Sequence, residues 1–147
     1  MDSIDGKIIE ILQITGKISM HALADQIPMS IPATCERVKK LEDAGVIKGY
    51  AAEIDSKKLG YSVTGYILFA CNLGAVDRVR ELLEKDNRAK RIEFLAGKFT
   101  MMIEFACVDM DDYLDFLNLI MPLGTSETYV KVGTIKKGIY TIPPSNC

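Results

Sequence analysis

Apolar residues recur at helical spacing through the first 41 positions and predict three short helices. The first is expected from Asp2 to Ile14, with apolar positions three or four residues apart. Two more are expected between Ser19 and Leu41, each opened by a serine, a residue favoured at helix N-caps. Pro28 interrupts the pattern, because proline disfavours the α region for the residue before it. Two helices joined by so tight a turn predict a helix-turn-helix, whose second helix can enter a DNA major groove.

The second helix of this pair is expected to begin at Ser30 and to end before Gly45. A helical wheel separates its residues into two faces. The face toward the core contains Ile31, Thr34, Val38 and Leu41. The face free to meet a partner contains Pro32, Ala33, Glu36, Lys39 and Lys40. Arg37 lies on the border, where it can reach a phosphate or pair with a nearby acid such as Asp25.

The rest of the chain alternates between strand and helix patterns. Residues 46–55 are β-prone but broken by Gly49, which suggests a small wing followed by an extended connector, and residues 56–60 form a turn. Strands are then expected at 61–73, 89–95, 101–107 and 125–135, with helices at 76–85 and 110–121. This βαββαβ order is that of a ferredoxin-like domain. The predicted fold class is therefore α+β, with a winged helix-turn-helix over 1–50, a hinge over 51–60 and a ferredoxin-like domain over 61–147.

The strand at 61–73 is apolar on both faces. Right-handed crossovers place both helices of a βαββαβ unit on one face of its sheet, so the other face needs a separate cover. At this length, a second copy of the chain is the simplest cover. The pattern therefore predicts a dimer whose isolated protomer is not stably soluble.

Composition narrows the possible functions. The chain has 147 residues, a net charge of −2 and a pI near 5.4, so it is not a strongly basic protein that coats nucleic acid. A DNA binder of this charge must gather its lysines and arginines on one face. No apolar run approaches the length of a membrane span, and acids near the N-terminus argue against a signal peptide. A cytoplasmic, nucleoid-associated protein is expected, with Cys35, Cys71, Cys107 and Cys147 as reduced thiols.

An enzyme is the main alternative from another class, because ferredoxin-like folds carry many chemistries. The residues argue against it. His21 is the only histidine and has no metal ligand four residues on, so it is read as a surface residue or one near a phosphate. Cys35 has no histidine neighbour to activate it. Asp109, Asp111 and Asp112 stand at a helix start, where capping explains them better than a metal site. No phosphate-binding loop is present, and neither a cofactor nor a metal is expected.

Three stretches carry a resemblance to a known family. They are DSIDGKIIEIL near the start, MSIPATCERVKKLEDAGVIKGYAAEID through the second predicted helix, and TSETYVKVGTIKKG near the end. With the KKLG turn and the domain order, they make the chain resemble the Lrp/AsnC family of transcriptional regulators. The resemblance implies dimers that assemble further into tetramers or octamers and bend or wrap DNA. It also implies an amino-acid effector in many members.

The resemblance also locates an effector loop in which this chain departs from the pattern. Members typically carry Gly-Asp-Tyr-Asp between the second and third strands of this domain, and here the loop is Gly97, Lys98, Phe99 and Thr100. Both acids that would attract an ammonium group are missing. Either the chain has no effector, or it binds a different one of more acidic character. No response to the common amino acids is expected.

The expected function is sequence-preferring regulation of transcription. The residues expected at the DNA are Ser30, Pro32, Ala33, Glu36, Arg37, Lys39, Lys40 and His21. The alternative is a DNA-architectural protein with little sequence specificity and no effector, because the outer face offers no Asn or Gln for adenine.

Overall fold

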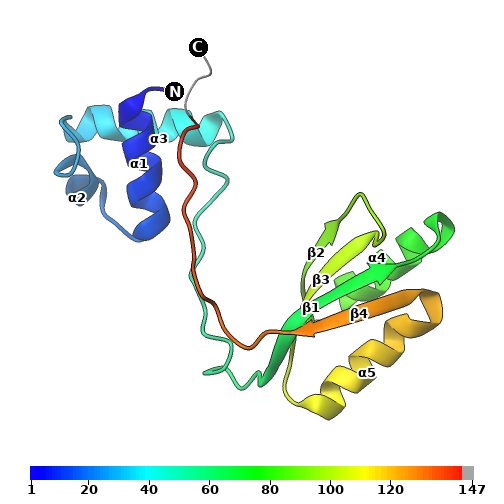
Figure 1. Ribbon diagram of the computed structural model, residues 1–147. Helices are drawn as coiled ribbons and strands as arrows, with labels where there is room; N and C mark the ends of the chain where they lie inside the picture. Colours follow the sequence, from blue (N-terminus) through cyan, green and yellow to red (C-terminus); the bar gives the residue numbers. More distant parts are fainter. Residues whose placement is uncertain (144–147) are drawn as a thin grey trace. The chain divides into compact units, whose positions relative to one another are not determined.

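Residues 1–143 are described by the computed structural model, in which the chain folds as two units (Figure 1). The first unit contains residues 1–53 and the described part of the C-terminal segment, residues 136–143. The second unit contains residues 54–135. The sequence placed all of 61–147 in the second domain. The structure differs because the segment from residue 136 packs on the first helix, a contact that no local pattern reveals.

The first unit is built on three helices, α1 (Ser3–Ile14), α2 (Met20–Ala24) and α3 (Ile31–Asp43). Asp2 and Ser19 accept backbone N–H bonds at the starts of α1 and α2, which satisfies donors that a helix leaves unpaired. The core of the unit consists of Ile8, Leu12, Leu23, Ile27, Val38 and Leu41. The three predicted helices are thus present, close to their predicted bounds.

The expected wing is not formed as a strand: residues 46–55 contain no β-strand. The chain instead folds back on the end of α3, where the N–H groups of Val46 and Ile47 both bond to the Leu41 carbonyl at 3.0 and 3.1 Å. Gly45 permits this reversal with a φ of 69°, and Gly49 follows with a φ of 151°. Beyond this point the segment is an extended connector.

The second unit is a four-stranded antiparallel sheet covered by two helices on one face (Figure 1). Its elements are β1 (Val63–Ala70), α4 (Val76–Lys85), β2 (Ala89–Phe94), β3 (Met101–Cys107), α5 (Met110–Ile120) and β4 (Thr125–Val130), with short 3₁₀ turns at Leu73–Ala75 and Met121–Leu123. The spatial order β2-β3-β1-β4 confirms the predicted ferredoxin-like arrangement.

Two of the strands are shorter than predicted. β1 covers Val63–Ala70 rather than 61–73, and β4 ends at Val130 rather than at residue 135. The Lys131 N–H still bonds to the Thr64 carbonyl at 2.8 Å, but the partner strand β1 begins at Val63, one residue before Thr64. The chain beyond Lys131 therefore has no neighbouring strand to pair with.

The two faces of β1 differ in burial. Val63, Ile67 and Phe69 are buried against α4 and α5, whereas Tyr66, Leu68 and Ala70 on the opposite face are only half-buried. Gly65 allows β4 to approach closely, since a Cβ atom there would lie 2.2 Å from the Tyr129 carbonyl oxygen. The sheet thus has one covered face and one open face. On the open face the residues of β1 are apolar, and their neighbours include Glu104 on β3 and Glu127 on β4. Within residues 1–143, none of the helices has the length and apolar character to cross a membrane.

Candidate nucleic-acid interface

Local interactions fix where α3 begins. The Ser30 hydroxyl accepts the Ala33 N–H at 3.4 Å, and Pro32 stands in the first turn, where its missing N–H leaves no bond unmade. Thr34 is fully buried, and its hydroxyl donates to the Ser30 carbonyl at 3.0 Å, so the buried polar group is satisfied. The N-cap at Ser30 and the helix that follows it are as predicted.

The division of α3 into two faces is confirmed except at one residue. Thr34, Val38 and Leu41 are buried, as expected. Ile31 is 41% exposed, so the prediction that it faces the core was wrong. Ile31 is the first residue of α3 and is not part of the core cluster of its unit. On the outer face Pro32, Glu36, Lys39 and Lys40 are exposed, and Ala33 is half-buried.

An ion pair joins two of the outer residues. Lys40 Nζ lies 2.7 Å from Glu36 Oε1, one turn apart on α3, and both side chains are about two-thirds exposed or more, at 71% and 67%. The hydrogen bond from Lys40 lowers the pKa of Glu36. The pair is too solvated to contribute much stability, so either group is available to a partner. Lys39 makes no ion pair within residues 1–143.

Arg37 pairs with acids other than the one proposed from the sequence. Its Nη1 lies 2.6 Å from Asp2 Oδ2 and 2.8 Å from Asp5 Oδ1, at the start of α1. Asp25 instead lies 3.9 Å from His21, and both of those side chains are exposed. The predicted partner Asp25 is therefore replaced by two acids at the start of α1.

Asp2 and Asp5 also bond to each other's backbone in a reciprocal capping box. The Asp5 N–H and then the Arg37 guanidinium lower the pKa of Asp2. The Asp2 N–H and then Arg37 lower the pKa of Asp5, and the two carboxylates raise the pKa of Arg37. Sequence reasoning gave these acids only a helix-dipole role. Their spacing of three residues at a helix start could have predicted the capping box.

The loop resembling an effector site lies between β2 and β3. Lys98 Nζ lies 2.8 Å from Glu127 Oε1 of β4 and 4.7 Å from the Phe99 ring centroid. The bond to Glu127 raises the pKa of Lys98, and Lys98 lowers the pKa of Glu127. Tyr129 also donates to Glu127, at 2.9 Å. Thr100 is committed to the fold, since its N–H and hydroxyl both bond to the Phe69 carbonyl, at 2.9 and 3.1 Å. Gly97 is exposed.

Two of the residues considered for enzymatic chemistry, Asp109 and Asp112, have structural roles. Asp109 caps α5 by accepting the Asp112 N–H at 2.9 Å, and Asp112 pairs with Arg88 at 3.1 Å. No cluster of three or more potential metal ligands occurs within residues 1–143. Cys35 is exposed, Cys71 half-buried and Cys107 buried, all as free thiols, whereas Cys147 lies outside the described residues.

Comparisons with known proteins agree with this geometry. Residues 1–48 match the family described as winged helix-turn-helix DNA-binding. The chain is 32% identical over 133 residues to the HTH-type transcriptional regulator LrpC of Bacillus subtilis, covering 88% of this chain and 90% of that protein. It is also 32% identical over 120 residues to the regulator FL11 of Pyrococcus horikoshii, covering 82% of this chain and 80% of that one.

Solved structures give the same result for the fold. The structure of B. subtilis LrpC superposes with a TM-score of 0.87 at 29% identity, covering 94% of this chain and 99% of that one. A Neisseria meningitidis regulator solved as an L-Met complex shares the fold, with a TM-score of 0.85 at 21% identity over 97% of this chain and 96% of that one. These relatives are regulators rather than enzymes. The chain is therefore a member of the Lrp/AsnC family and a DNA-binding transcriptional regulator.

Proposed function

We propose that the chain binds DNA as a homodimer in which each protomer places α3 in a major groove. The observation that carries the proposal is the outer face of α3. Pro32, Glu36, Lys39 and Lys40 are exposed there, while the opposite face of the same helix is buried in the core of its unit. A helix docked in a groove needs such a face.

The contacts divide by chemistry. The Ser30 hydroxyl uses its oxygen to cap α3, so its proton is available to a phosphate at the positive end of the helix. Pro32, Ala33 and Glu36 approach base edges, while Lys39 and Lys40 contact phosphates and His21 lies beside one. We assign Arg37 a different task from the one expected, because its guanidinium is engaged by two carboxylates. It holds α3 in place.

The dimer follows from the open face of the sheet. Leu68 lies between Met102 on β3 and Glu127 on β4, and Tyr66 lies beside Tyr129, while α4 and α5 pack on the other face of the sheet. We propose that the same face of a second copy covers it, which places two α3 helices on one duplex. The resemblance further implies assembly into tetramers or octamers that bend DNA, and association with the nucleoid in the cytoplasm.

Removing the two lysines tests the docking of α3. Lys39→Ala together with Lys40→Ala should weaken binding to all sequences and reduce the salt slope, log K against log[salt], by about 1.8 for two lost phosphate contacts. Affinity is measured from 50 to 200 mM salt on a duplex that the chain itself selects from a random pool. The matched control is Lys57→Ala with Lys58→Ala, an adjacent pair of exposed lysines in the second unit. Unchanged affinity of the α3 variant at low salt would refute the docking.

A second candidate function is a DNA-architectural protein with little sequence preference. The outer face of α3 favours it, since this face has no Asn or Gln and Arg37 beside it is engaged by Asp2 and Asp5. Readout would then depend on DNA shape and phosphates. Competition between the selected duplex and random DNA at fixed salt separates the two. A specificity ratio near one favours the architectural function.

For the effector, we propose that the 97–100 loop does not bind an amino acid through its ammonium group. The nearby Glu127 carboxylate already accepts bonds from Lys98 and Tyr129. The Neisseria neighbour was solved with L-Met, so a ligand of that class is the natural comparison. Thermal-shift screening against the twenty proteinogenic amino acids should give no stabilisation, and a clear shift with one of them would overturn the proposal. An acidic metabolite is the alternative class of ligand to screen.

A further inference from the structure

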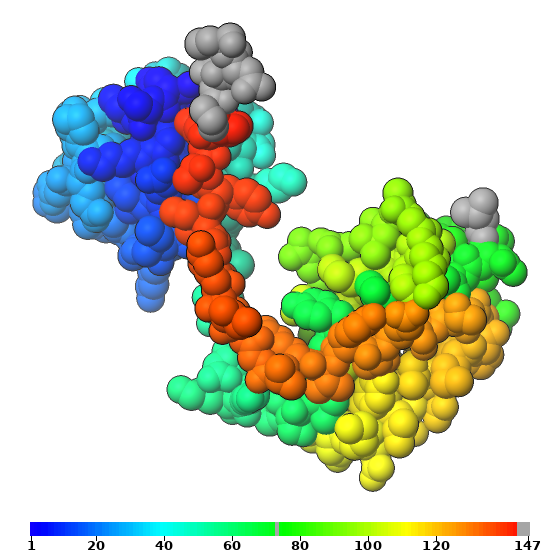
Figure 2. All heavy atoms as spheres, viewed as in Figure 1, coloured from blue at the N-terminus to red at the C-terminus, as the bar shows by residue number. Residues whose placement is uncertain are grey.

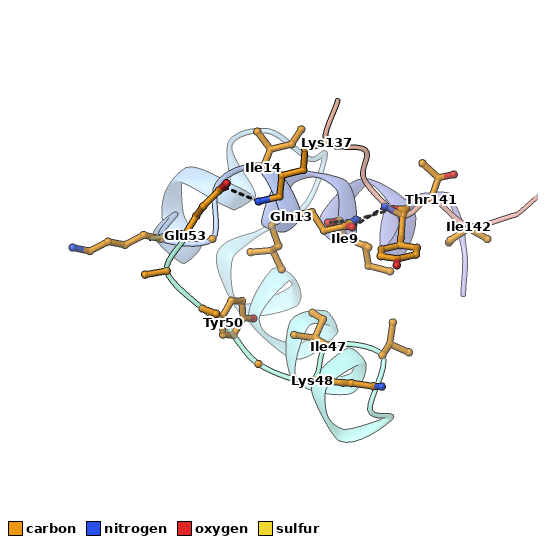
Figure 3. Close-up of a pocket in the computed structure, with 18 of the residues that line it drawn as sticks. Ile9, Gln13, Ile14, Ile47, Lys48, Tyr50, Glu53, Lys137, Thr141 and Ile142 are labelled. Carbon is orange, nitrogen blue, oxygen red and sulfur yellow. Dashed lines mark hydrogen bonds and ion pairs between the residues drawn. The ribbon is translucent and has the colours of Figure 1, made fainter. Parts of the chain in front are cut away.

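The C-terminal segment of residues 136–143, here called the C-terminal strap, lies along the outside of α1. The Tyr140 N–H donates to Gln13 Oε1 at 2.8 Å, and Gln13 Nε2 donates to the Tyr140 carbonyl at 2.7 Å. The Gln13 side-chain amide thus makes the same two hydrogen bonds to the Tyr140 backbone that a neighbouring β-strand would make. Figure 3 shows the Gln13 amide joined to the strap, and Figure 2 shows the strap, in red, against the blue helices of the first unit.

Two further contacts fix the course of the strap. Ile142 packs over Gly6, where an added Cβ atom would lie 3.2 Å from its Cδ1, so the lack of a side chain at Gly6 allows the close approach. Lys137 Nζ reaches Glu53 Oε2 on the connector at 2.6 Å (Figure 3). Gly6 and Gln13 lie roughly 10 Å apart along α1. The strap therefore runs antiparallel to α1 and contacts it at both points.

Elsewhere the strap bridges a hollow instead of filling a core. A cavity of about 890 Å³ is lined by the strap, the end of α1 and residues 46–53. Ile9, Leu12 and Ile47 contribute to its lining, and Tyr140 is 87% exposed. Because so little apolar surface of the strap is buried at Tyr140, the Gln13 amide is the contact that determines its position there.

Another side of α1 faces the recognition helix α3. Ile8 and Leu12 share a core with Val38 and Leu41 of α3. At the start of α1, Asp2 and Asp5 hold Arg37 of α3 at 2.6 and 2.8 Å. α1 thus lies between the strap and α3, with hydrogen bonds or ion pairs to each.

We propose that Gln13 is a positioning residue for DNA binding: it docks the C-terminal strap on α1, and α1 sets the position of α3 through Arg37. The strap continues in the chain from β4 through residues 131–135, so the last strand of the second unit is linked to the recognition helix by this route as well as by the connector. The proposal rests on the proposed docking of α3 in DNA.

The residue type at position 13 matters because the two hydrogen bonds to the Tyr140 backbone need a donor and an acceptor on one planar side-chain group. Gln13→Ala removes both bonds to Tyr140. Gln13→Glu keeps the acceptor but places a carboxylate oxygen against the Tyr140 carbonyl, which repels it. The matched control is Gln26→Ala. Gln26 is an exposed glutamine of the same unit, and within residues 1–143 its amide bonds only to the carbonyl of Ala22, one turn earlier, at 3.3 Å.

The test measures affinity for the selected duplex, and its salt slope, on the full chain well below its unfolding temperature. Gln13→Ala and Gln13→Glu should weaken binding by roughly three- to thirtyfold, as residues coupled to a site without touching it do. The salt slope should not change, because no phosphate contact is lost. Combining Gln13→Ala with Arg37→Lys should cost less than the product of the two separate losses, because both act on one chain of contacts.

Three results would overturn the proposal. One is a lower unfolding temperature with unchanged affinity, which would make Gln13 a stabilising residue only. The second is a salt slope reduced by about one unit, which would mean that the variant loses a contact between a cationic side chain and a phosphate. The third is independent, multiplicative losses in the double variant. If the α3 lysine variant loses affinity while Gln13→Ala matches Gln26→Ala, only the strap proposal fails. If the lysine variant binds normally, the docking of α3 itself fails.

Discussion

Arg37 shows how a single side chain can link two helices that are distant in sequence. The sequence left it two partners, a phosphate or a nearby acid, and the structure gives it Asp2 and Asp5, 35 and 32 residues away. The type of interaction was predictable, because an arginine at the border between the buried and exposed faces of a helix is well placed to pair with a carboxylate. Its partners were not, since the angle at which α1 crosses α3 depends on packing rather than on local pattern.

Neutralising one of these acids should reduce stability in a pH-dependent way. The pKa of Asp5 is lowered in the folded chain, so its contribution is present above the unfolded pKa and is lost as pH falls through the folded one. Asp5→Asn should cost about 1 kcal/mol near pH 7, the usual range for a capping contact. The difference from the unmodified chain should shrink below about pH 4, where the unfolded carboxyl becomes protonated.

Thermal unfolding followed by circular dichroism at pH 7 and pH 3 measures this difference. Asp25→Asn is the control, because Asp25 is exposed and lies 3.9 Å from a single histidine. An Asp5→Asn variant as stable as the control at pH 7 would show that the capping box and the Arg37 pair add nothing to the fold.

At the scale of elements, local signals were sufficient where an element is defined by its own residues. Ser30, Pro32 and Gly45 mark the bounds of α3, and each lies where capping rules place it. Local sequence signals failed where secondary structure depends on pairing with another segment. Residues 46–55 have β-prone side chains but no neighbouring strand, so the wing did not form as a strand.

Cys35 offers a chemical footprint of α3. It is exposed on the recognition helix, whereas Cys107 is buried and has its pKa raised to about 11 by that burial, so its thiol is unreactive at pH 8. In a Cys147→Ser background, Cys35 should react with a disulfide reagent well ahead of Cys107. Saturating duplex DNA should slow the reaction of Cys35 several-fold, because a helix in a groove is shielded from solvent.

The control for this footprint is salt. At 1 M NaCl, added to dissociate the complex, protection should disappear while the rate without DNA stays the same. An equal Cys35 rate with and without saturating DNA at low salt would show that this part of α3 stays open to solvent in the complex.

At the scale of the whole molecule, the βαββαβ order was readable because each strand and helix carries its own periodicity. The placement of residues 136–143 in the first unit was not predictable. The strap has no strong periodic pattern, and its partner Gln13 lies 127 residues away from Tyr140. The candidate DNA face was predicted because it is one side of one helix. The support behind it, from Asp2, Asp5 and the strap, depends on contacts between distant segments.

The open sheet face should hold two copies of the chain together. Leu68 is half-buried in the middle strand of that face, opposite Met102, and a charge there would have to be buried against the second copy. Leu68→Asp should therefore convert a dimer at about 10 μM into monomer or insoluble protein, measured by sedimentation velocity. Leu114→Asp is the control. Leu114 is 47% exposed on α5, away from this face, so the substitution should leave the dimer intact.

The Leu68→Asp variant should also bind a duplex with two half-sites no more tightly than a duplex with one. The unmodified dimer should prefer the duplex with two half-sites, because two linked helices bind far more tightly than either alone. A chain that sediments only as monomer at this concentration, before any substitution, would show that the open face is covered in some other way.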